Sequence, residues 1–420
     1  MNVILIFPDQ INTEELKDWW YVPKYVTKKR KPQPPFGVLC LYTAISTNHN
    51  VTLLDNCVKK LSNEELVEWC LNQNPDVVGF SGTMHEWSQA AVVAKELKTR
   101  SNVITIYGGP NATARPEKHI RYFDYVFRGM ADDTLLEFLN RLELGNPVDD
   151  IPGLCNRDYP EIKPVHFIRN LDMLKWPDRT TLNKDDYRYA DSIVVTSKGC
   201  PFSCKFCSSR YIWEKKYLTR SIDDVMREIR HLKNTYNIDT VIFREDNFTI
   251  NKERLFAFCQ HLADLNLSWR CQSRVNSLNR ETIVRMKESG CAAISCGFES
   301  INDSTLQYVK KGQTAKQVRA TIDLLDGLEM PWTGGFMVAT PNEGRQEIEN
   351  TIRFVKKVSR YPHSKLPKSV VRFVGMPVSD LYYEVVRNGL VDYDWQEGEL
   401  LFPHTYHLTN NQIVNIIKNT

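Results

Sequence analysis

Three cysteines lie close together in the sequence, at a spacing that suits a metal cluster. Cys200, Cys204 and Cys207 belong to the segment Cys-Pro-Phe-Ser-Cys-Lys-Phe-Cys. Three thiolates on one loop can wrap a single cubane [4Fe-4S] cluster, and the missing fourth ligand leaves one iron open to bind a further molecule. A zinc site would need a fourth ligand from a second cysteine pair or a histidine pair, and neither follows nearby. We therefore expect a cluster that does chemistry rather than one that only passes electrons.

The cysteine loop follows the first of six apolar runs that alternate with helical patterns. Such a repeat of strand and helix predicts parallel strands joined by right-handed crossovers. Six strands are too few for a closed eight-stranded barrel, so the predicted architecture is a partial (β/α)6 barrel that is open on one side. The predicted strands are 192–197, 240–244, 269–275, 292–299, 332–338 and 370–375, and the predicted helices are 221–235, 252–265, 280–289, 315–327 and 346–360.

A second alternation of strands and helices precedes the barrel. It predicts a doubly wound α/β domain of the flavodoxin or Rossmann type. In such a sheet, ligands bind beyond the carboxyl ends of the strands, where glycine lets the backbone approach a ligand closely. The predicted strands are 3–7, 51–54, 76–82, 103–107 and 125–128, and the predicted helices are 63–73, 85–100 and 132–143.

These patterns divide the chain into four predicted parts. Residues 1–143 form the doubly wound domain, and residues 144–187 form a proline-rich linker without sustained periodicity. Residues 188–380 form the partial barrel. Residues 381–420 are rich in aromatic side chains and form a C-terminal capping extension.

The composition is that of a soluble globular protein with no specialised charged surface. The chain has 420 residues, of which 42% are hydrophobic and 25% charged, and its net charge is +3. No apolar run is long enough to span a membrane, the N-terminus lacks signal-peptide features, and the balanced charge argues against a nucleic-acid surface. We therefore expect a cytoplasmic protein, whose eleven cysteines are reduced thiols, metal ligands or core residues rather than disulfides.

The cysteine loop and the strands after it resemble the radical S-adenosylmethionine superfamily. In that family the open iron binds S-adenosylmethionine, and an electron from the cluster cleaves it to methionine and a 5′-deoxyadenosyl radical. The resemblance rests on Phe206 between the second and third cysteines and on motifs at the ends of successive strands. The residues that it implies as contacts of S-adenosylmethionine are Phe206, Glu245, Asp246, Asn247, Gln272, Ser273, Arg274, Glu299 and Ser300.

Purely structural roles are the alternative for several of these residues. Asp246 and Glu299 could be helix caps at strand ends, and Arg274 could pair with an acid at the surface. Three further cysteines, Cys271, Cys291 and Cys296, lie in or beside predicted strands. We expect them to be buried inert thiols, although a second cluster is the alternative.

The N-terminal domain resembles the cobalamin-binding domain of the radical S-adenosylmethionine enzymes that carry both cofactors. The resemblance includes Ile151-Pro152-Gly153-Leu154 in the linker. The Asp-x-His-x-x-Gly motif is absent, and His119 has the wrong surroundings, so no histidine ligand to cobalt is expected. The alternative is a domain that folds without a corrin. The residues implied as cobalamin contacts are Ser81, Gly82, Thr83, Gly108, Gly109, Pro110, Asn111 and Gly129.

The two-cofactor layout implies a methyltransferase that acts on an unactivated carbon or phosphorus centre of a small molecule or peptide. An electron donor such as flavodoxin or ferredoxin would then be a partner. A radical cyclisation or rearrangement, with or without cobalamin, is the first alternative, and an iron-sulfur redox sensor is a more remote one. No catalytic acid or base and no substrate contact is predicted.

Overall fold

The structure is a computed structural model that describes residues 1–9, 31–158, 161–367, 370–391 and 401–420. Small parts of the predicted linker (159–160) and of the predicted C-terminal extension (392–400) lie outside the described residues. The chain forms two compact units. The first holds the described residues of 1–13, 30–190 and 211–213, and the second holds those of 191–210 and 214–420.

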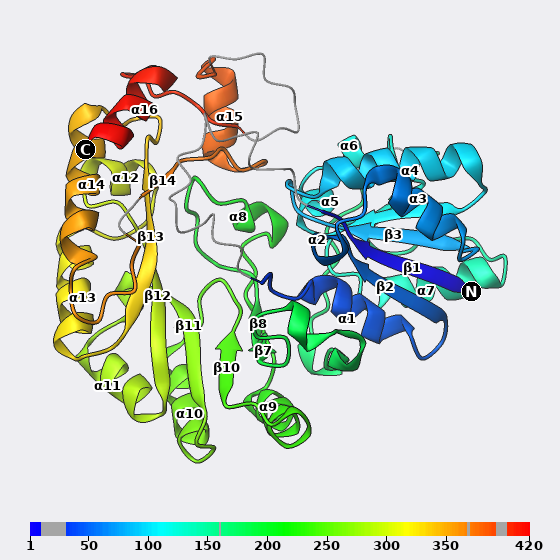
Figure 1. The fold of residues 1–420 in the computed structure, drawn as a ribbon, viewed down its shortest axis with the longest axis horizontal. Helices are drawn as coiled ribbons and strands as arrows, with labels where there is room; N and C mark the ends of the chain where they lie inside the picture. Colours follow the sequence, from blue (N-terminus) through cyan, green and yellow to red (C-terminus); the bar gives the residue numbers. More distant parts are fainter. Residues whose placement is uncertain (10–30, 159–160, 368–369, 392–400) are drawn as a thin grey trace. The chain divides into compact units, whose positions relative to one another are not determined.

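The first unit is a six-stranded sheet with the strand order β2-β1-β3-β4-β5-β6 (Figure 1). The first five strands pair in parallel, and β6 pairs antiparallel with β5. The strands are β1 (Asn2–Phe7), β2 (Asn50–Asp55), β3 (Val77–Ser81), β4 (Ile104–Gly108), β5 (Tyr125–Phe127) and β6 (Leu154–Asn156). The helices are α1 (Phe36–Ile45), α2 (Asn56–Lys59), α3 (Asn63–Leu71), α4 (Trp87–Arg100), α5 (Pro110–Ala114), α6 (Pro116–His119) and α7 (Thr134–Glu143).

Strand β1 shows why this sheet carries helices on both faces. Its central residues are apolar and buried throughout, as in a parallel strand covered on both sides. Because successive side chains point to opposite faces, Ile4 and Ile6 pack with α3 and α4, whereas Val3 and Leu5 pack with α1 and α7. The predicted doubly wound domain is thereby confirmed. Strand β6 was not predicted, because three residues are too few to show a period.

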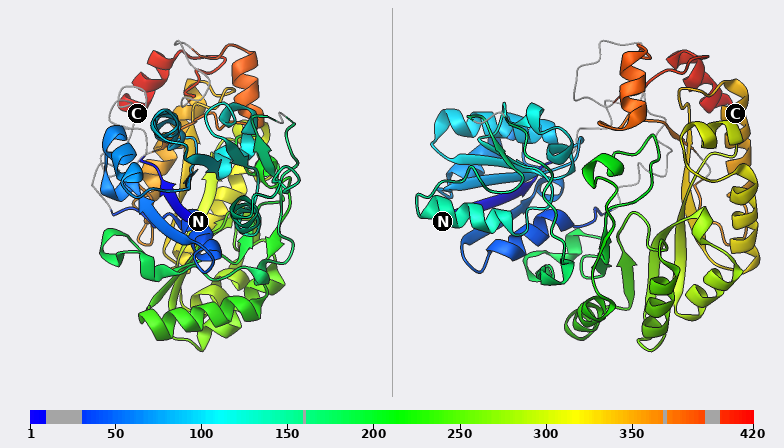
Figure 2. Two further views of the ribbon diagram at one scale, coloured as in Figure 1. Left: turned by 90° about the vertical axis from the view of Figure 1, so that its right-hand side faces the viewer. Right: turned by 180° about the vertical axis from the view of Figure 1, so that it is seen from behind.

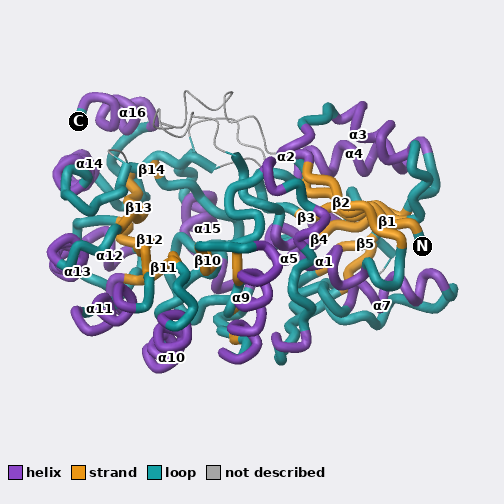
Figure 3. Tube along the Cα trace, turned by 60° about the horizontal axis from the view of Figure 1, so that its bottom comes forward, coloured by secondary structure: helices purple, strands orange, loops and turns teal. Residues whose placement is uncertain are grey.

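The second unit is a six-stranded, all-parallel sheet with the order β14-β13-β12-β11-β10-β7. The two edge strands do not pair with each other, so the predicted open (β/α)6 barrel is confirmed. Figures 2 and 3 show the long helices that alternate with its strands along the outer side of the curved sheet. The strands are β7 (Ile193–Val194), β10 (Thr240–Phe243), β11 (Ser268–Arg274), β12 (Cys291–Glu299), β13 (Trp332–Val338) and β14 (Val371–Arg372).

The helices of the second unit begin at well-defined caps. Helix α9, for example, starts after Ser221, whose hydroxyl accepts a hydrogen bond from the Asp224 N–H, and ends at Asn237 in a left-handed conformation. The helices are α9 (Ile222–Tyr236), α10 (Lys252–Ala263), α11 (Arg280–Glu288), α12 (Asp303–Tyr308), α13 (Ala315–Gly327), α14 (Arg345–Val358), α15 (Asp380–Arg387) and α16 (Asn410–Asn419). The short helix α8 (Ser209–Ile212) has its first two residues in this unit and its last two in the first unit. Short 3-10 turns occupy Leu171–Met173, Arg179–Thr181, Lys184–Asp186 and Val275–Ser277.

A small two-stranded sheet brackets the cysteine loop. Strand β8 (Ser197–Lys198) leads into the loop, and β9 (Leu218–Thr219) leaves it and pairs antiparallel with β8. The loop between them is therefore closed at its base. It follows β7, the first strand of the barrel, as the sequence predicts.

Candidate functional site

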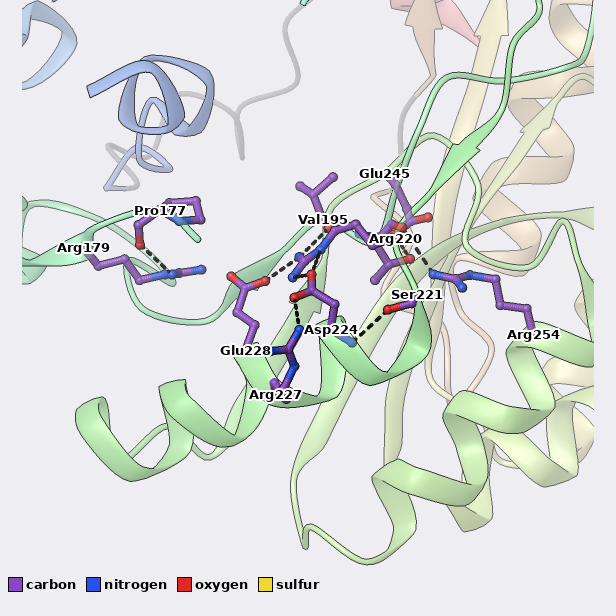
Figure 4. A network of polar contacts seen from close by, with 11 residues as sticks. Pro177, Arg179, Val195, Arg220, Ser221, Asp224, Arg227, Glu228, Glu245 and Arg254 are labelled. Carbon is purple, nitrogen blue, oxygen red and sulfur yellow. Dashed lines mark hydrogen bonds and ion pairs between the residues drawn. The ribbon is translucent and has the colours of Figure 1, made fainter. Parts of the chain in front are cut away.

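The entry to the cysteine loop is fixed by a buried ion-pair network (Figure 4). Arg220 donates from Nη1 to the carbonyl of Val195 at 3.0 Å, and its own N–H donates to the carbonyl of Thr196 at 3.0 Å. Its guanidinium also pairs with Asp224 at 2.6 Å and with Glu228, and both carboxylates are almost fully buried. A guanidinium shared in this way holds the backbone before Cys200 in one position.

Glu245, at the carboxyl end of β10, holds the same segment from another side. Its carboxylate accepts the N–H and hydroxyl of Thr196 at 3.1 and 2.8 Å, and it also accepts the hydroxyl of Ser197. Burial raises the pKa of Glu245, whereas these hydrogen bonds act to lower it. The side chain predicted to contact S-adenosylmethionine thus already holds the strand before the cysteine loop.

Of the three predicted cluster ligands, Cys204 is buried and Cys200 and Cys207 are half-buried. Burial raises the pKa of the Cys200 thiol and raises that of Cys207 to about 11, and the neighbouring cysteines contribute to both shifts. The Cys207 sulfur accepts the Ser209 N–H at 3.4 Å, and the Ser209 hydroxyl donates to Asp246 at 2.9 Å. Asp246 is therefore linked to the cluster loop, and this contact is not that of a helix cap.

Arg274, at the end of β11, lies directly against the cysteines. Its Nη1 donates to the Cys204 sulfur at 3.4 Å, its Nη2 donates to the Lys311 carbonyl, and its guanidinium lies 3.9 Å from the Phe202 ring centroid. The residue is only 7% exposed. Among the described residues, no carboxylate is within ion-pair distance of it and its Nε has no hydrogen-bond partner. A buried cation of this kind calls for an anion beside it.

Lys311 connects the surroundings of the cysteine loop to Glu299 at the end of β12. The sequence did not predict this residue as part of the site. Its ammonium pairs with Glu299 at 2.6 Å and lies 5.6 Å from the Phe206 ring centroid. Glu299 has a φ of 64°, a left-handed conformation that costs energy in a non-glycine residue and that is often found at functional sites. Gly297 leaves room for the pair, because a Cβ there would lie 2.7 Å from both charged groups.

The remaining predicted contacts of S-adenosylmethionine either have hydrogen-bond partners within the barrel or are exposed. The Asn247 Oδ1 accepts from Thr249, whose hydroxyl lies 2.6 Å from that of Ser273. The Ser300 hydroxyl is buried and accepts the N–H of Asn302 at the start of α12, as a local cap does. The Gln272 side chain is exposed. The roles predicted for these residues stay predictions.

The other barrel cysteines lie in the core. Cys271, Cys291 and Cys296 are buried in the main hydrophobic cluster of the second unit. Burial raises the pKa of Cys296 to about 12 and raises that of Cys271 as well, with the neighbouring Cys291 contributing. Such thiols stay protonated and unreactive, which agrees with the expectation of inert core residues.

The carboxyl ends of β3 and β4 in the first unit carry small residues and close backbone contacts. Gly109 has a φ of 94°, and a Cβ there would lie 2.9 Å from the Gly82 carbonyl oxygen and 2.9 Å from the Ser81 hydroxyl. The N–H and hydroxyl of Thr83 both donate to the buried Glu86 at 2.7 and 2.6 Å. The turns predicted to contact cobalamin therefore lie side by side. Pro110, predicted with them, is exposed, whereas Asn111 is buried.

Gly129 and His119 are both packed tightly against neighbouring residues of the first unit. Gly129 has a φ of 105°, and a Cβ there would lie 2.2 Å from the His166 carbonyl oxygen, so glycine is needed for backbone contact. His119 is fully buried against Tyr107 and Trp87, with ring centroids 4.7 and 5.5 Å apart, and burial lowers its pKa to about 3. This agrees with the expectation that His119 is not a cobalt ligand.

Within the described residues, no group of three or more His, Cys, Asp or Glu side chains is arranged to hold a metal ion. The ligands of a cubane cluster bind different iron atoms, so this observation concerns sites for a single ion. In the same part of the chain, no helix has the length and apolar character needed to cross a membrane.

Comparisons with known proteins identify both units. Residues 194–355 match the radical SAM superfamily and residues 24–139 match the B12 binding domain. An uncharacterised methyltransferase of Pyrococcus horikoshii is 29% identical over 410 residues, which cover 92% of this chain and 86% of that protein. An anaerobic magnesium-protoporphyrin IX monomethyl ester cyclase of Rubrivivax gelatinosus is 25% identical over 77% of this chain and 62% of its own length.

A solved structure has the same fold across both units. The radical S-adenosylmethionine methyltransferase TsrM of Kitasatospora setae, with cobalamin and a [4Fe-4S] cluster bound, superposes with a TM-score of 0.72 at 14% identity. The match covers 92% of this chain and 75% of that one.

Proposed function

Because this chain belongs to the radical S-adenosylmethionine enzymes that carry a B12-binding domain, we propose that it methylates an unactivated carbon or phosphorus centre of a small molecule or peptide. The observation that carries the proposal is the presence of both domains in one chain. The similarity to a methyltransferase over 92% of the chain supports methyl transfer as the reaction.

The residues around Cys200, Cys204 and Cys207 fit a [4Fe-4S] cluster. The buried Arg274 cation faces the Cys204 sulfur, where an anionic cluster with thiolate ligands would compensate its charge. Burial keeps the bare thiols of Cys200 and Cys207 protonated, and bound iron would stabilise their thiolates. When bound, the cluster supplies the electron that cleaves S-adenosylmethionine, and cobalamin supplies the methyl carrier.

The predicted contacts of S-adenosylmethionine divide into two proposed groups. Asp246, Arg274 and Glu299 surround the cysteine loop with charge, and we assign to them the direct contacts with the amino, carboxylate and ribose groups. Phe206 and Gln272 would add contacts beside them. Glu245, Asn247, Ser273 and Ser300 already have hydrogen bonds within the barrel, so their proposed part is to hold the strand ends in position.

The strand ends of the first unit fit a large flat ligand. Ser81, Gly82, Thr83, Gly108 and Gly109 place backbone and small side chains where ligands of doubly wound sheets bind. We propose that cobalamin lies over these turns, with Pro110, Asn111 and Gly129 at their edge. The sequence has no Asp-x-His-x-x-Gly motif, so we propose no histidine ligand for the cobalt.

The test is transfer of label from S-adenosylmethionine. The full chain, purified without oxygen and reconstituted with iron, sulfide and cobalamin, is incubated with S-adenosylmethionine labelled in the methyl group, a low-potential reductant and candidate substrates. We expect labelled product and 5′-deoxyadenosine to form together. Formation of 5′-deoxyadenosine without label in any product would reject methyl transfer.

Radical cyclisation is the second candidate, because a cyclase is among the similar proteins. Product mass separates the two reactions: methylation adds one methyl group, whereas cyclisation leaves the carbon count unchanged. In either case we propose that a small electron-transfer protein, such as a flavodoxin or ferredoxin, reduces the cluster.

A further inference from the structure

The cysteine loop is held in its middle by the C-terminal part of the chain. The Lys205 carbonyl, between the second and third cysteines, accepts the N–H of Leu381 in α15 at 3.0 Å. The Lys205 N–H donates to the Val309 carbonyl at 2.9 Å. The backbone beside Cys204 is therefore bonded to two segments that lie more than a hundred positions away in the sequence.

Glu384 in α15 is the point where these segments meet. Its Oε2 accepts the Lys205 ammonium at 2.9 Å, and its Oε1 accepts the hydroxyls of Tyr308 and Tyr406, the latter at 2.9 Å. The Lys205 ammonium also lies 4.2 Å from the Tyr308 ring centroid. Burial acts to raise the pKa of Glu384, but the three hydrogen bonds outweigh it and lower the pKa. The carboxylate thus stays charged at neutral pH and keeps its three hydrogen bonds.

Two further contacts bind the loop to the same helix. Phe206 packs against an apolar cluster that includes Leu381 and Val385 of α15. Arg210, just after the third cysteine, pairs with Asp380 at 2.6 Å. The side chains of Lys205 and Glu384 are only 17% and 19% exposed, so their ion pair is less weakened by solvent than a surface pair.

Removal of the carboxylate would take away an acceptor that three donors share. The Lys205 ammonium and the hydroxyls of Tyr308 and Tyr406 would lose the one group that they share. Loss of these hydrogen bonds in a partly buried region favours local opening, and the opening would centre on the loop between Cys204 and Cys207. The barrel core lies elsewhere and would keep its packing.

We propose that Glu384 is a positioning residue that sets the conformation of the cluster loop through Lys205 and Tyr308. The inference rests on the proposed function, in which Cys200, Cys204 and Cys207 hold the cluster. It gives the C-terminal extension a specific role, because α15 then shapes the surroundings of the cluster.

The experiment compares Glu384→Ala with Glu281→Ala in the full chain. Glu281 forms an exposed ion pair with Lys252 at 2.7 Å on the outside of the barrel, so its removal makes the same charge change away from the loop. Hydrogen–deuterium exchange of the peptides spanning 199–217 is measured as purified and after reconstitution. We expect exchange to be roughly tenfold faster in Glu384→Ala and unchanged in Glu281→Ala.

The electron paramagnetic resonance spectrum of the reduced cluster gives a second readout. Glu384→Ala is expected to change the g-values with S-adenosylmethionine present and to retain cluster iron, whereas Glu281→Ala matches the wild type. Glu384→Gln, which keeps an acceptor for the tyrosines, is expected to restore part of the protection. Unchanged loop exchange and spectra in Glu384→Ala would overturn the proposal.

Two outcomes separate this proposal from the proposed function. If the wild type takes up no cluster, the proposed function fails, and exchange in the purified protein still tests the role of Glu384. If Glu384→Ala does not fold, Tyr406→Phe removes one of the hydrogen bonds to the same carboxylate, together with the bond that Asn388 donates to the Tyr406 hydroxyl. This variant is expected to speed loop exchange by a smaller factor, and wild-type exchange in it would overturn the proposal.

Discussion

The two units present very different residues at the same architectural position, the carboxyl ends of their parallel strands. In the barrel these ends carry the charged side chains of Asp246, Arg274 and Glu299, which are held in place by contacts with the cysteine loop and Lys311. In the first unit they carry Ser81-Gly82-Thr83 and Gly108-Gly109, where backbone approaches backbone. The barrel thus offers charged side chains to its ligands, whereas the first unit offers backbone and small side chains.

This difference predicts that the two cofactors depend on separate features. Binding of the cluster or of S-adenosylmethionine in the barrel should fail when a thiol or a charged side chain is removed. Cobalamin binding in the first unit should fail when a larger side chain is introduced at the strand-end turns. Variants of one type should leave the other cofactor in place, because each set of contacts lies within its own unit.

Replacement of a cluster ligand should have the largest effect. Cys204→Ala removes a buried thiol that accepts a hydrogen bond from Arg274, and we expect loss of cluster iron and sulfide and no cleavage of S-adenosylmethionine. Cobalt content should stay at the wild-type level. Cys271→Ala is the control, because Cys271 is a core thiol, and it should keep the cluster. Loss of the cluster in the control would favour a ligand role for Cys271.

Arg274→Met should keep the cluster but weaken its chemistry. Loss of the cation beside the Cys204 sulfur makes added negative charge less favourable, so the midpoint potential should become more negative. We expect cleavage of S-adenosylmethionine to fall by about 10²-fold, as for loss of one electrostatic contact in a buried site. Arg270→Met, an exposed residue on the same strand, is the control. Equal potentials in the two variants would contradict the role given to Arg274.

Gly109→Val tests the first unit. The valine backbone would have to adopt a φ near 94°, and its Cβ would meet the Gly82 carbonyl oxygen. We therefore expect a loss of about 1–3 kcal/mol in the stability of this unit. Bound corrin per chain should fall several-fold while cluster iron is retained. Gly145→Val is matched, because its φ of 68° is also positive but nothing lies within 4 Å of a Cβ there. Normal corrin binding in Gly109→Val would remove these turns from the proposed cobalamin site.

Glu343→Gln should have the smallest effect on the cofactors and a clear effect on pH dependence. Burial raises the pKa of Glu343 to about 7, and hydrogen bonds from Thr305 and Thr340 only partly offset this. The unfolded chain therefore ionises first, and stability falls by on the order of 3 kcal/mol as the pH rises from about 4.5 to about 7. In unfolding measured across this range, Glu343→Gln should lack that fall. The same slope in the variant would assign it to another group.

The sequence predicted the parts of the molecule that local patterns determine. Strand patterns such as Trp332–Val338 and the spacing of Cys200, Cys204 and Cys207 are visible in short windows. The short strand β6 was missed, since Leu154–Asn156 shows no period.

The missed residues of the site belong to contacts between distant segments. Lys311 meets the side chain of Arg274 across 37 positions, and Glu384 meets Lys205 across 179. A lysine after a short helix and a glutamate in an amphipathic helix both look like surface residues. Only the folded chain shows that each is mostly buried against the cluster loop.

The most direct test of two separable cofactor sites is ultraviolet–visible spectroscopy of the anaerobically reconstituted full chain. We expect cluster and corrin absorption together in the wild type, corrin absorption alone in Cys204→Ala, and cluster absorption with several-fold weaker corrin absorption in Gly109→Val. A wild-type chain without corrin absorption, or the loss of both bands in either variant, would contradict this expectation.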